Sequence, residues 1–500
     1  MCLQKNQSSE HHCHSSVVSS ATMSEVSIPL LAPIDADVLL SKGLAGPVTR
    51  TGVRRLHKRR LDSSSEEENA TIPLCDVMGP DADIYMAYAE LPADIFSEAT
   101  LRHIGFEASV AALLWQRWVD WPTDPSQPSR EVDDEIQGMP FIDFATGYVK
   151  GRHIDADGES DTEWFDCLGS CGVDQATQQA IMSPIYRRIR LTESCVYWIC
   201  DTMTTRFETL KMVQRASHER AMAMARSRSR QSASTSQVES STGGQSRSVS
   251  ETQRQQRYMQ QSTALSASTL GAQHAPGHTV LYTGLSQWRI RGTINTLAHT
   301  VLPRLTTTID LFDQNNRVIP ARMRELRSPP LTDFSRNSAF YFAIDRYMAL
   351  YYANYAKHRD GVGSVVIIHI AIPNSATERL DATERQTLYW PDPNWREVVW
   401  NSRRGDALPR RLSRFAVATL IIGTVASKPQ SVYNRLDSPD LITERFVLKN
   451  RDGRNAVQYV FLEREGEEFL KEHGCRALTV FGLTAAENAE WEERERLSSN

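Results

Sequence analysis

Two long polar tracts interrupt this chain and limit how much of it can enter a hydrophobic core. Residues 1–75 are rich in serine and lack periodic apolar positions, and residues 226–275 are largely serine, glutamine and arginine. Such segments bury too little apolar surface to offset the entropy lost on folding. We therefore expect a disordered tail at 1–75, a helical module at 76–225, a flexible linker at 226–275, a second domain at 276–480 and a charged tail at 481–500.

Charge and hydropathy exclude several classes of protein. The net charge of −5 over 500 residues gives the whole chain no general attraction for nucleic acid. The longest apolar run, Phe415 to Ala426, is too short to span a bilayer, and residues 1–25 lack the apolar segment of a secretory signal. We expect a cytoplasmic or nuclear protein with no nucleic-acid or membrane partner.

A basic cluster lies near the end of the first polar tract. It comprises Arg54, Arg55, Lys58, Arg59 and Arg60 and precedes a run of serine and glutamate. Short basic runs of this kind serve as nuclear-import signals when they are accessible. The alternative is a solvated charged segment with no function of its own.

The cysteines indicate reduced thiols rather than a disulfide framework. Eight of them are dispersed along the chain, and no secretory signal accompanies them. Cys167 and Cys171 have a spacing that could hold a metal, but no second Cys or His pair follows at the spacing of a zinc site. We expect no metal.

Apolar side chains recur at helical spacing in residues 76–225. One set is Val110, Leu113, Leu114 and Trp118, and the other is Val196, Ile199, Met203, Phe207 and Leu210. This period predicts amphipathic helices, the second beginning near Thr192. The segment is similar to helical modules of fungal proteins and carries no catalytic constellation, so we expect a small all-α domain.

Residues 276–480 alternate between strand-like and helix-like segments. Runs of β-branched and aromatic residues predict strands at 278–284, 365–372, 418–425, 446–449 and 458–462. Helices are predicted at 290–300, 346–357, 394–402 and 467–472. This order predicts an α+β domain.

Four segments of this domain stand in an informative order. Val280 to Gly284 is followed by the motif Asp333 to Ala343 and a helix-like run, and then by Leu420 to Ala426 and Val457 to Phe461. In this order they resemble the NAD-binding core of the ADP-ribosyltransferase fold, most closely small ADP-ribosyltransferase-like domains of unknown function. The resemblance covers residues 275–475 and implies a mixed, split sheet that binds NAD.

The resemblance also assigns roles to individual residues. Gly284 matches the glycine whose backbone grips the nicotinamide carboxamide. Tyr341 and Tyr352 match the two aromatic residues that stack on the nicotinamide ring, where offset stacking contributes about 0.5–1.5 kcal/mol. Ser335 would belong to the loop over the pocket.

Three positions depart from the pattern of active transferases. Thr283 stands in place of a histidine that bonds a ribose, and Ala349 in place of a serine that bonds the carboxamide. Gln458 stands in place of the catalytic glutamate and offers no charge to the oxocarbenium ion, a loss of about 2–4 kcal/mol of transition-state stabilisation. Glu463 and Glu444 are the nearby carboxylates, but the odd offset of Glu463 from Gln458 points it to the opposite face of a strand.

Two functional hypotheses follow from this pattern. In the first, the chain binds NAD and is a weakly active or inactive ADP-ribosyltransferase or NAD glycohydrolase, with Tyr341 and Gln458 at the reacting centre, Thr283 and Gln458 on the riboses, and a protein or water as acceptor. In the second, it is a non-enzymatic scaffold with a degenerate transferase-like fold and protein partners. A binder should keep a cleft between Tyr341 and Tyr352, whereas a scaffold should fill that space with side chains.

Overall fold

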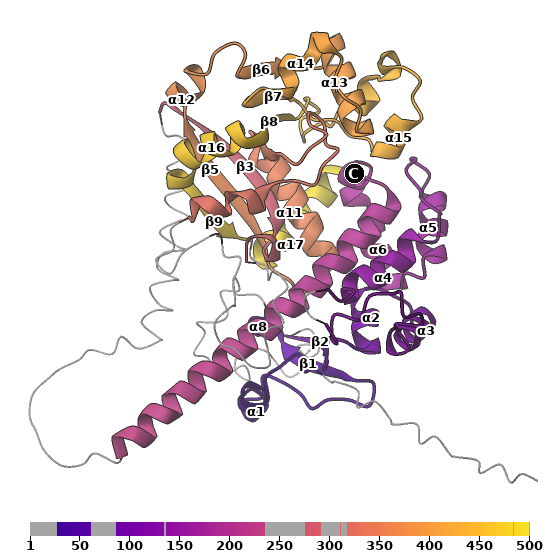
Figure 1. Ribbon diagram of the computed structural model, residues 1–500, viewed down its shortest axis with the longest axis vertical. Helices are drawn as coiled ribbons and strands as arrows, with labels where there is room; N and C mark the ends of the chain where they lie inside the picture. Colours follow the sequence, from indigo (N-terminus) through magenta and orange to yellow (C-terminus); the bar gives the residue numbers. More distant parts are fainter. Residues whose placement is uncertain are drawn as a thin grey trace, which may run out of the picture.

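The computed structural model describes residues 28–61, 87–134, 137–235, 276–291, 311, 318–483 and 485–499. Figure 1 shows a group of helices from the N-terminal half of the chain packed beside a sheet domain from the C-terminal half. The longest helix, α8 (Cys195–Thr235), passes between them, and its C-terminal end projects away from both.

Residues 28–61 are folded, which corrects the prediction of a disordered tail over 1–75. They form helix α1 (Pro33–Ser41), strand β1 (Val53–His57) and a 3₁₀ turn (Lys58–Arg60), and β1 pairs antiparallel with β2 (Tyr88–Pro92). This unit is hard to recognise in the sequence because its apolar residues follow no regular period, yet Leu30, Leu39 and Leu56 are buried. Residues 1–27 and 62–75 lie outside the described residues.

The basic cluster belongs to this folded unit rather than to a flexible tail. Arg54 and Arg55 are in β1, and Arg55 pairs with Glu90 across the hairpin at 3.4 Å. The backbone N–H and C=O groups of a paired strand form hydrogen bonds with the neighbouring strand. The cluster is therefore part of a folded strand and turn rather than of a flexible tail, although Arg55 and Lys58 are exposed.

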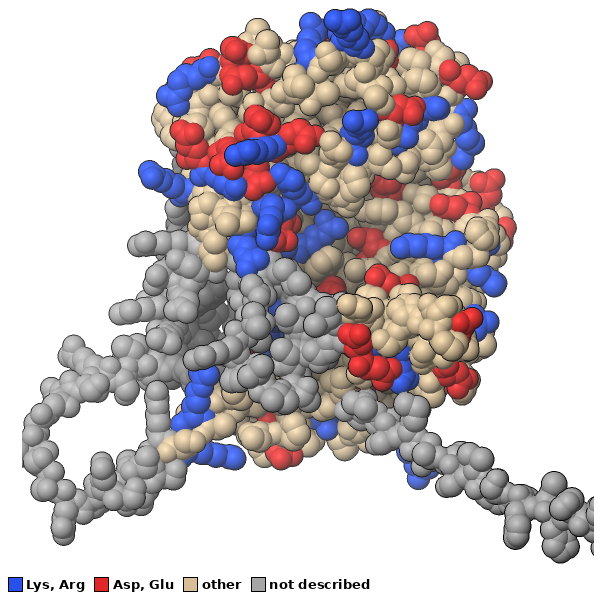
Figure 2. Space-filling model, in the orientation of Figure 1, with Lys and Arg blue, Asp and Glu red and all other residues tan. Residues whose placement is uncertain are grey.

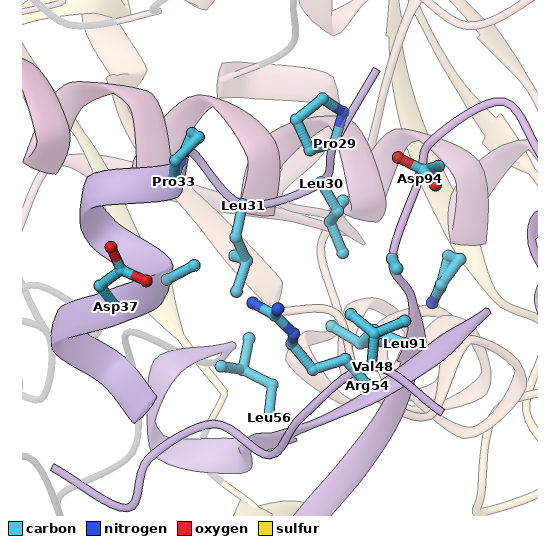
Figure 3. Close-up of a pocket in the computed structure, with 13 residues that line it drawn as sticks. Pro29, Leu30, Leu31, Pro33, Asp37, Val48, Arg54, Leu56, Leu91 and Asp94 are labelled. Carbon is cyan, nitrogen blue, oxygen red and sulfur yellow. The ribbon is translucent and has the colours of Figure 1, made fainter. Parts of the chain in front are cut away.

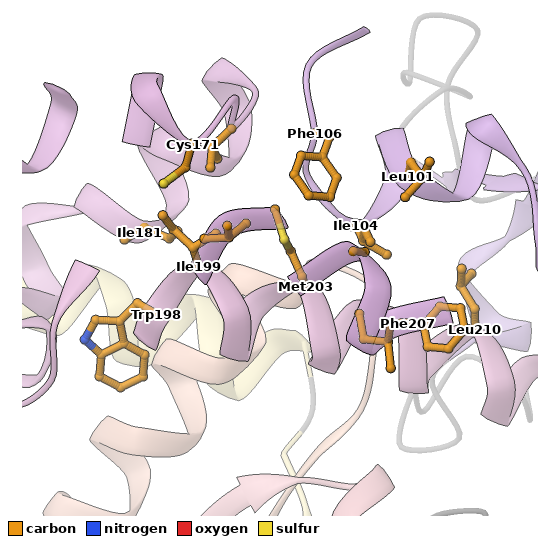
Figure 4. Close-up of a cluster of buried hydrophobic side chains, with 14 of the residues drawn as sticks. Leu101, Ile104, Phe106, Cys171, Ile181, Trp198, Ile199, Met203, Phe207 and Leu210 are labelled. Carbon is orange, nitrogen blue, oxygen red and sulfur yellow. The ribbon is translucent and has the colours of Figure 1, made fainter. Parts of the chain in front are cut away.

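A helical module follows, but residues 76–225 are not the all-α domain predicted, because Tyr88–Pro92 form strand β2. Its helices are α2 (Glu98–Ile104), α3 (Ala108–Val119), α4 (Phe141–Lys150), α5 (Asp161–Ser170), α6 (Gln175–Met182), α7 (Arg187–Arg190) and α8. Both periodic sets lie in helices, although Leu113 is 44% exposed, so it does not belong to the buried stripe. The buried face of α8 carries Ile199, Met203, Phe207 and Leu210 (Figure 4), which form the centre of the core.

The boundaries of α8 differ from the predicted ones. It begins at Cys195, whereas the hydroxyl of Thr192 donates to the carbonyl of Ile189 in the preceding turn. It also continues to Thr235, into the segment predicted as a linker. Arginine, glutamine and alanine in residues 226–235 are good helix formers, which favours continuation of the helix. Residues 236–275 are not among those described.

The second domain is α+β with a mixed sheet. Its strands are β3 (His278–Ser286), β4 (Phe340–Ala343), β5 (Val365–Pro373), β6 (Arg385–Leu388), β7 (Leu420–Thr424), β8 (Val457–Phe461) and β9 (Leu478–Gly482). Their order is β6-β7-β8-β4-β3-β5-β9, and only the β6–β7 pair is parallel. β3 and β4 share a single residue pair, Tyr282 with Ala343, so the two halves of the sheet are narrowly joined.

Helices cover both faces of this sheet. They are α10 (Trp288–Arg291), α11 (Arg346–Asp360), α12 (Asn374–Glu378), α13 (Pro393–Arg404), α14 (Ser413–Ala416), α15 (Gln430–Asn434), α16 (Glu463–His473) and α17 (Ala485–Ser499). α11 and α13 pack on the face that carries Tyr282 and Val460, and α16 packs on the opposite face.

Most of the predicted strands and helices of this domain are confirmed, but one strand is not. The strand predicted at 446–449 makes only isolated bridges, from Val447 to Ala426 and from Lys449 to Asn455. Of the helix predicted at 290–300, residues 290 and 291 lie in α10, and residues 292–300 lie outside the described residues. The short strands β4, β6 and β9 were not among the predicted strands, because none of them has a long β-branched run.

The helical module and the sheet domain share one hydrophobic core. Tyr351 and Tyr355 of α11 project into the helical module, where the ring of Tyr355 stacks on Tyr186 at 4.9 Å. Trp491 of α17 stacks on the other side of this group, 5.6 Å from Tyr186, and is only 6% exposed. The charged tail predicted at 481–500 is thus partly a helix that closes the core, and residue 500 is not described.

Candidate functional site

A buried carboxylate, Asp333, occupies the centre of the region that the sequence assigns to the site. It lies in the loop before β4 and is 3% exposed. Its Oδ1 accepts hydrogen bonds from Nε and Nη2 of Arg403, at 2.9 and 2.7 Å. Its Oδ2 accepts one from the backbone N–H of Ala426 and one from Nε2 of Gln458, both at 2.8 Å. Four donors therefore satisfy this carboxylate.

Arg403 links this carboxylate to the helical module. Its Nη1 donates to Oε1 of Glu193 at 3.1 Å, and Glu193 precedes α8. Burial disfavours the guanidinium charge, but Asp333 and Glu193 outweigh that effect and hold the pKa of Arg403 well above its usual range. Burial raises the pKa of Glu193, and Arg403 partly opposes the shift. We call Asp333, Arg403, Glu193 and Gln458 the charged cluster.

The two tyrosines predicted to stack on nicotinamide lie beside the charged cluster. The Tyr341 hydroxyl is hydrogen-bonded to the Thr332 hydroxyl and accepts from the backbone N–H of Phe334 at 3.4 Å. Burial raises the pKa of Tyr341 and of Tyr352, and the charge of Asp333 adds to both shifts. Both hydroxyls are therefore near the charged cluster.

The rings of these tyrosines pack into different cores. Tyr341 packs against the cluster that contains Phe334, Trp395 and Val460 on one face of the sheet. Tyr352 packs against the core shared with the helical module. Each ring therefore has protein side chains as its packing partners.

The glycine predicted to grip a carboxamide is covered by a helix. A Cβ atom on Gly284 would lie 2.0 Å from the carbonyl oxygen of Ala349 and 3.0 Å from the Cβ atom of Ala353, both in α11. A side chain at this position would collide with backbone, so the close approach of α11 to β3 requires glycine. This packing alone accounts for a glycine at position 284.

Thr283 and Gln458 point to opposite faces of the sheet. Tyr282 pairs with Ala343, and Ala343 pairs with Gln458, so these three side chains share one face. Thr283 follows Tyr282 and therefore faces the other side. The structure does not bring together the two residues predicted to hold the riboses.

The loop before β4 carries the remaining predicted site residue. Ser335 is buried, and its hydroxyl accepts from the backbone N–H of Asn337 at 3.0 Å. Its carbonyl accepts from the hydroxyl of Thr332 at 3.2 Å, the same hydroxyl that bonds Tyr341. Ser335 thus shapes the loop beside Tyr341.

Neither alternative carboxylate enters the charged cluster. Glu463 begins α16 and accepts a hydrogen bond from Asn337 at 2.8 Å. Glu444 pairs with Lys449 at 2.6 Å at the surface. The carboxylate that accepts from Gln458 is instead Asp333, and Glu193 pairs with the same Arg403. The sequence patterns assign neither carboxylate such a role.

A sequence signal existed for Arg403 but not for Glu193. Trp395, Val399 and Arg403 recur at intervals of four, which places Arg403 on the buried face of α13. In the sequence, Arg403 and Arg404 together resemble a basic helix end, but only Arg404 lies near the surface, where it pairs with Asp406. Glu193 lies in a turn, where no periodicity identifies a partner.

Comparisons of the chain with family models, curated proteins and solved structures found no match. Within the described residues, no group of His, Cys, Asp and Glu side chains could hold a metal ion. Cys167, Cys171 and Cys195 are free and buried in the helical module. No helix in the described parts of the chain is long and apolar enough to cross a membrane.

Proposed function

We propose that this protein is a non-enzymatic interaction protein whose sheet domain has a degenerate ADP-ribosyltransferase-like fold. The arrangement of the sheet supports the fold. The strands that carry the four resembling segments are consecutive neighbours, in the order β7-β8-β4-β3, and α11 follows β4 directly. The single residue pair between β3 and β4 agrees with the split sheet that the resemblance implies.

The main support for the proposed loss of catalysis is that the side chains of the charged cluster already bond one another. Asp333 binds Arg403, Gln458 and a backbone N–H, and Glu193 supplies a second carboxylate to Arg403. A nucleotide would have to break these buried bonds before it could use the same groups. Removing one partner of a buried ion pair typically costs about 3–5 kcal/mol, which opposes ligand entry.

The substitution Gln458→Glu tests this proposal because it restores the glutamate of active transferases. The Nε2 atom of Gln458 lies 2.8 Å from Oδ2 of Asp333. A carboxylate there would face a like charge, which raises its pKa and destabilises the fold. We expect the variant to be less stable and to release no more nicotinamide from NAD than the wild type, which should release none. Nicotinamide release by either protein would overturn the proposal.

Weak NAD binding is the second candidate, and one observation favours it. Tyr341, Tyr352 and Gln458, assigned to the site from different segments of the sequence, gather around Asp333. In this case NAD would be the ligand or substrate, and ADP-ribose would pass to a protein side chain or to water. The loss of the glutamate would keep the rate low.

Calorimetric titration of the full chain with NAD separates the two candidates. Saturable binding that Tyr352→Ala abolishes would establish the nucleotide site and overturn the scaffold proposal. Tyr347→Ala is the matched control, because Tyr347 is on the same helix but its hydroxyl donates to Glu495 at 2.9 Å. No saturable heat at millimolar NAD, with an unchanged circular dichroism spectrum, would support the scaffold.

The proposed partners are proteins, in the cytoplasm or the nucleus. Figure 2 shows acidic and basic side chains interspersed over much of one face of the molecule. Mixed charge is typical of a solvated surface and gives no extended field for a polyanion. Steep salt dependence of binding to RNA or DNA would contradict this part of the proposal.

A further inference from the structure

A pocket of about 370 Å³ lies between α1 and the β1–β2 hairpin (Figure 3). Its volume falls in the range of small-molecule sites. The walls are apolar, with Leu30, Leu31, Leu56 and Leu91 all buried. The charged cluster contributes no residue to it, so an inference about this pocket does not depend on the proposed function.

One cation, Arg54, faces this apolar space. Arg54 pairs with Leu91 across the hairpin, and side-chain alternation places it on the same face of β1 as the buried Leu56. Figure 3 shows its guanidinium group directed into the pocket, toward Leu31. The neighbouring Arg55 points to the other face, where it pairs with Glu90.

Within the described residues, the guanidinium group of Arg54 forms no ion pair. Its Nε is buried without a hydrogen-bond partner. The Arg54 side chain is only partly buried, but its buried Nε loses hydration that no hydrogen bond replaces. An anion that bonds the guanidinium group with two oxygens would restore those interactions.

We propose that this pocket binds a small molecule that carries one carboxylate on an apolar chain. The carboxylate pairs with Arg54, and the chain lies against Leu30, Leu31 and Leu91. The pocket wall also includes Asp37, which is exposed, and Asp94. These two carboxylates disfavour a multiply charged anion such as a phosphate, so a single negative charge fits best.

The test is calorimetric titration of the full chain with decanoate below its micelle concentration. We expect saturable binding of one molecule per chain. Decanol has the same chain without the charge, and butyrate has the charge with a short chain, and each should bind at least tenfold more weakly. Equal binding of decanoate and decanol would overturn the role of Arg54, and absence of saturable heat with decanoate would overturn the site.

Two adjacent arginines provide the matched variants. Arg54→Gln should weaken decanoate binding at least tenfold, and Arg54→Lys should fall between Arg54→Gln and the wild type, because lysine keeps the charge without the planar fork. Arg55→Gln should bind within twofold of the wild type. Equal weakening by Arg54→Gln and Arg55→Gln would indicate general surface attraction and would refute the proposal. Unchanged circular dichroism spectra establish that the variants are folded.

Discussion

Asparagine in place of Asp333 should destabilise this protein far more than the size of the change suggests. The substitution keeps the shape of the side chain but removes the charge that faces Arg403 at 2.7 Å. Asparagine also has only one acceptor oxygen, whereas the carboxylate receives donors at both oxygens. At least one buried donor must lose its partner.

The structure sets the expected magnitude. Breaking a buried ion pair costs about 3–5 kcal/mol, and Glu193 still compensates part of the charge of Arg403. We therefore expect Asp333→Asn to lower the free energy of unfolding by about 3 kcal/mol. Asp406→Asn is the control, because Asp406 pairs with the adjacent Arg404 at 2.8 Å but is half exposed. Pairs of that kind contribute less than about 1 kcal/mol.

Urea unfolding at pH 7, followed by far-UV circular dichroism, measures both free energies. The double variant Asp333→Asn with Arg403→Met removes both charges, so its cost should be smaller than the sum of the single costs by more than about 1 kcal/mol. A cost for Asp333→Asn no larger than that for Asp406→Asn would refute this reasoning. Additive single costs would show that the two side chains are not coupled.

Three further substitutions probe other parts of the fold. Burial raises the pKa of Asp360 from 3.8 to about 6, so between these pH values the folded state keeps a proton that the unfolded state has lost. The free energy of unfolding therefore falls as the pH rises from 4 to 6. Asp360→Asn should remove this loss, and its free energy of unfolding in urea should exceed that of the wild type by up to about 3 kcal/mol at pH 7.5 but not at pH 4. Equal pH profiles would contradict that account. Gly284→Ala places a Cβ atom against the backbone of α11 and should lower the free energy of unfolding by about 3 kcal/mol or more. Gly147→Ala, at an open position of α4, should instead raise it by about 0.5–1 kcal/mol. Thermal unfolding compares the two variants, and equal effects would be inconsistent with the packing of α11 on β3. Trp491→Ala should cost about 3–5 kcal/mol by emptying the shared core, and a loss below about 1 kcal/mol in urea unfolding would show that α17 is not part of it.

Elements with strong local patterns could be predicted from the sequence, whereas interactions between distant segments could not. β-branched runs located β3, β5, β7 and β8, and helical periodicity located α11, α13 and α16. The folded unit at residues 28–61 was missed because its stability comes from distant partners. The carboxylate of Asp35, for example, pairs with Arg220, 185 residues away, at 2.8 Å. The composition of residues 28–61 alone cannot predict such a contact.

The candidate site could likewise be predicted only in part. Motif order predicted that Tyr341, Tyr352 and Gln458 lie near one another, and all three lie around Asp333. The placement of Thr283 failed because its face of the sheet depends on strand register, which no local pattern specifies. Glu193 could not be found, since its pairing with Arg403 depends on how the helical module docks.

The position of Trp491 has a consequence for the synthesis of this protein. Trp491 belongs to the core that the helical module shares with α11, yet it follows Tyr186 by 305 residues in the chain. Domains generally fold in order as they leave the ribosome, but here the early helices cannot complete their core until α17 has been synthesised. A ribosome-bound nascent chain would expose the apolar surface around Tyr186 until then, so we expect it to depend on chaperones during that interval.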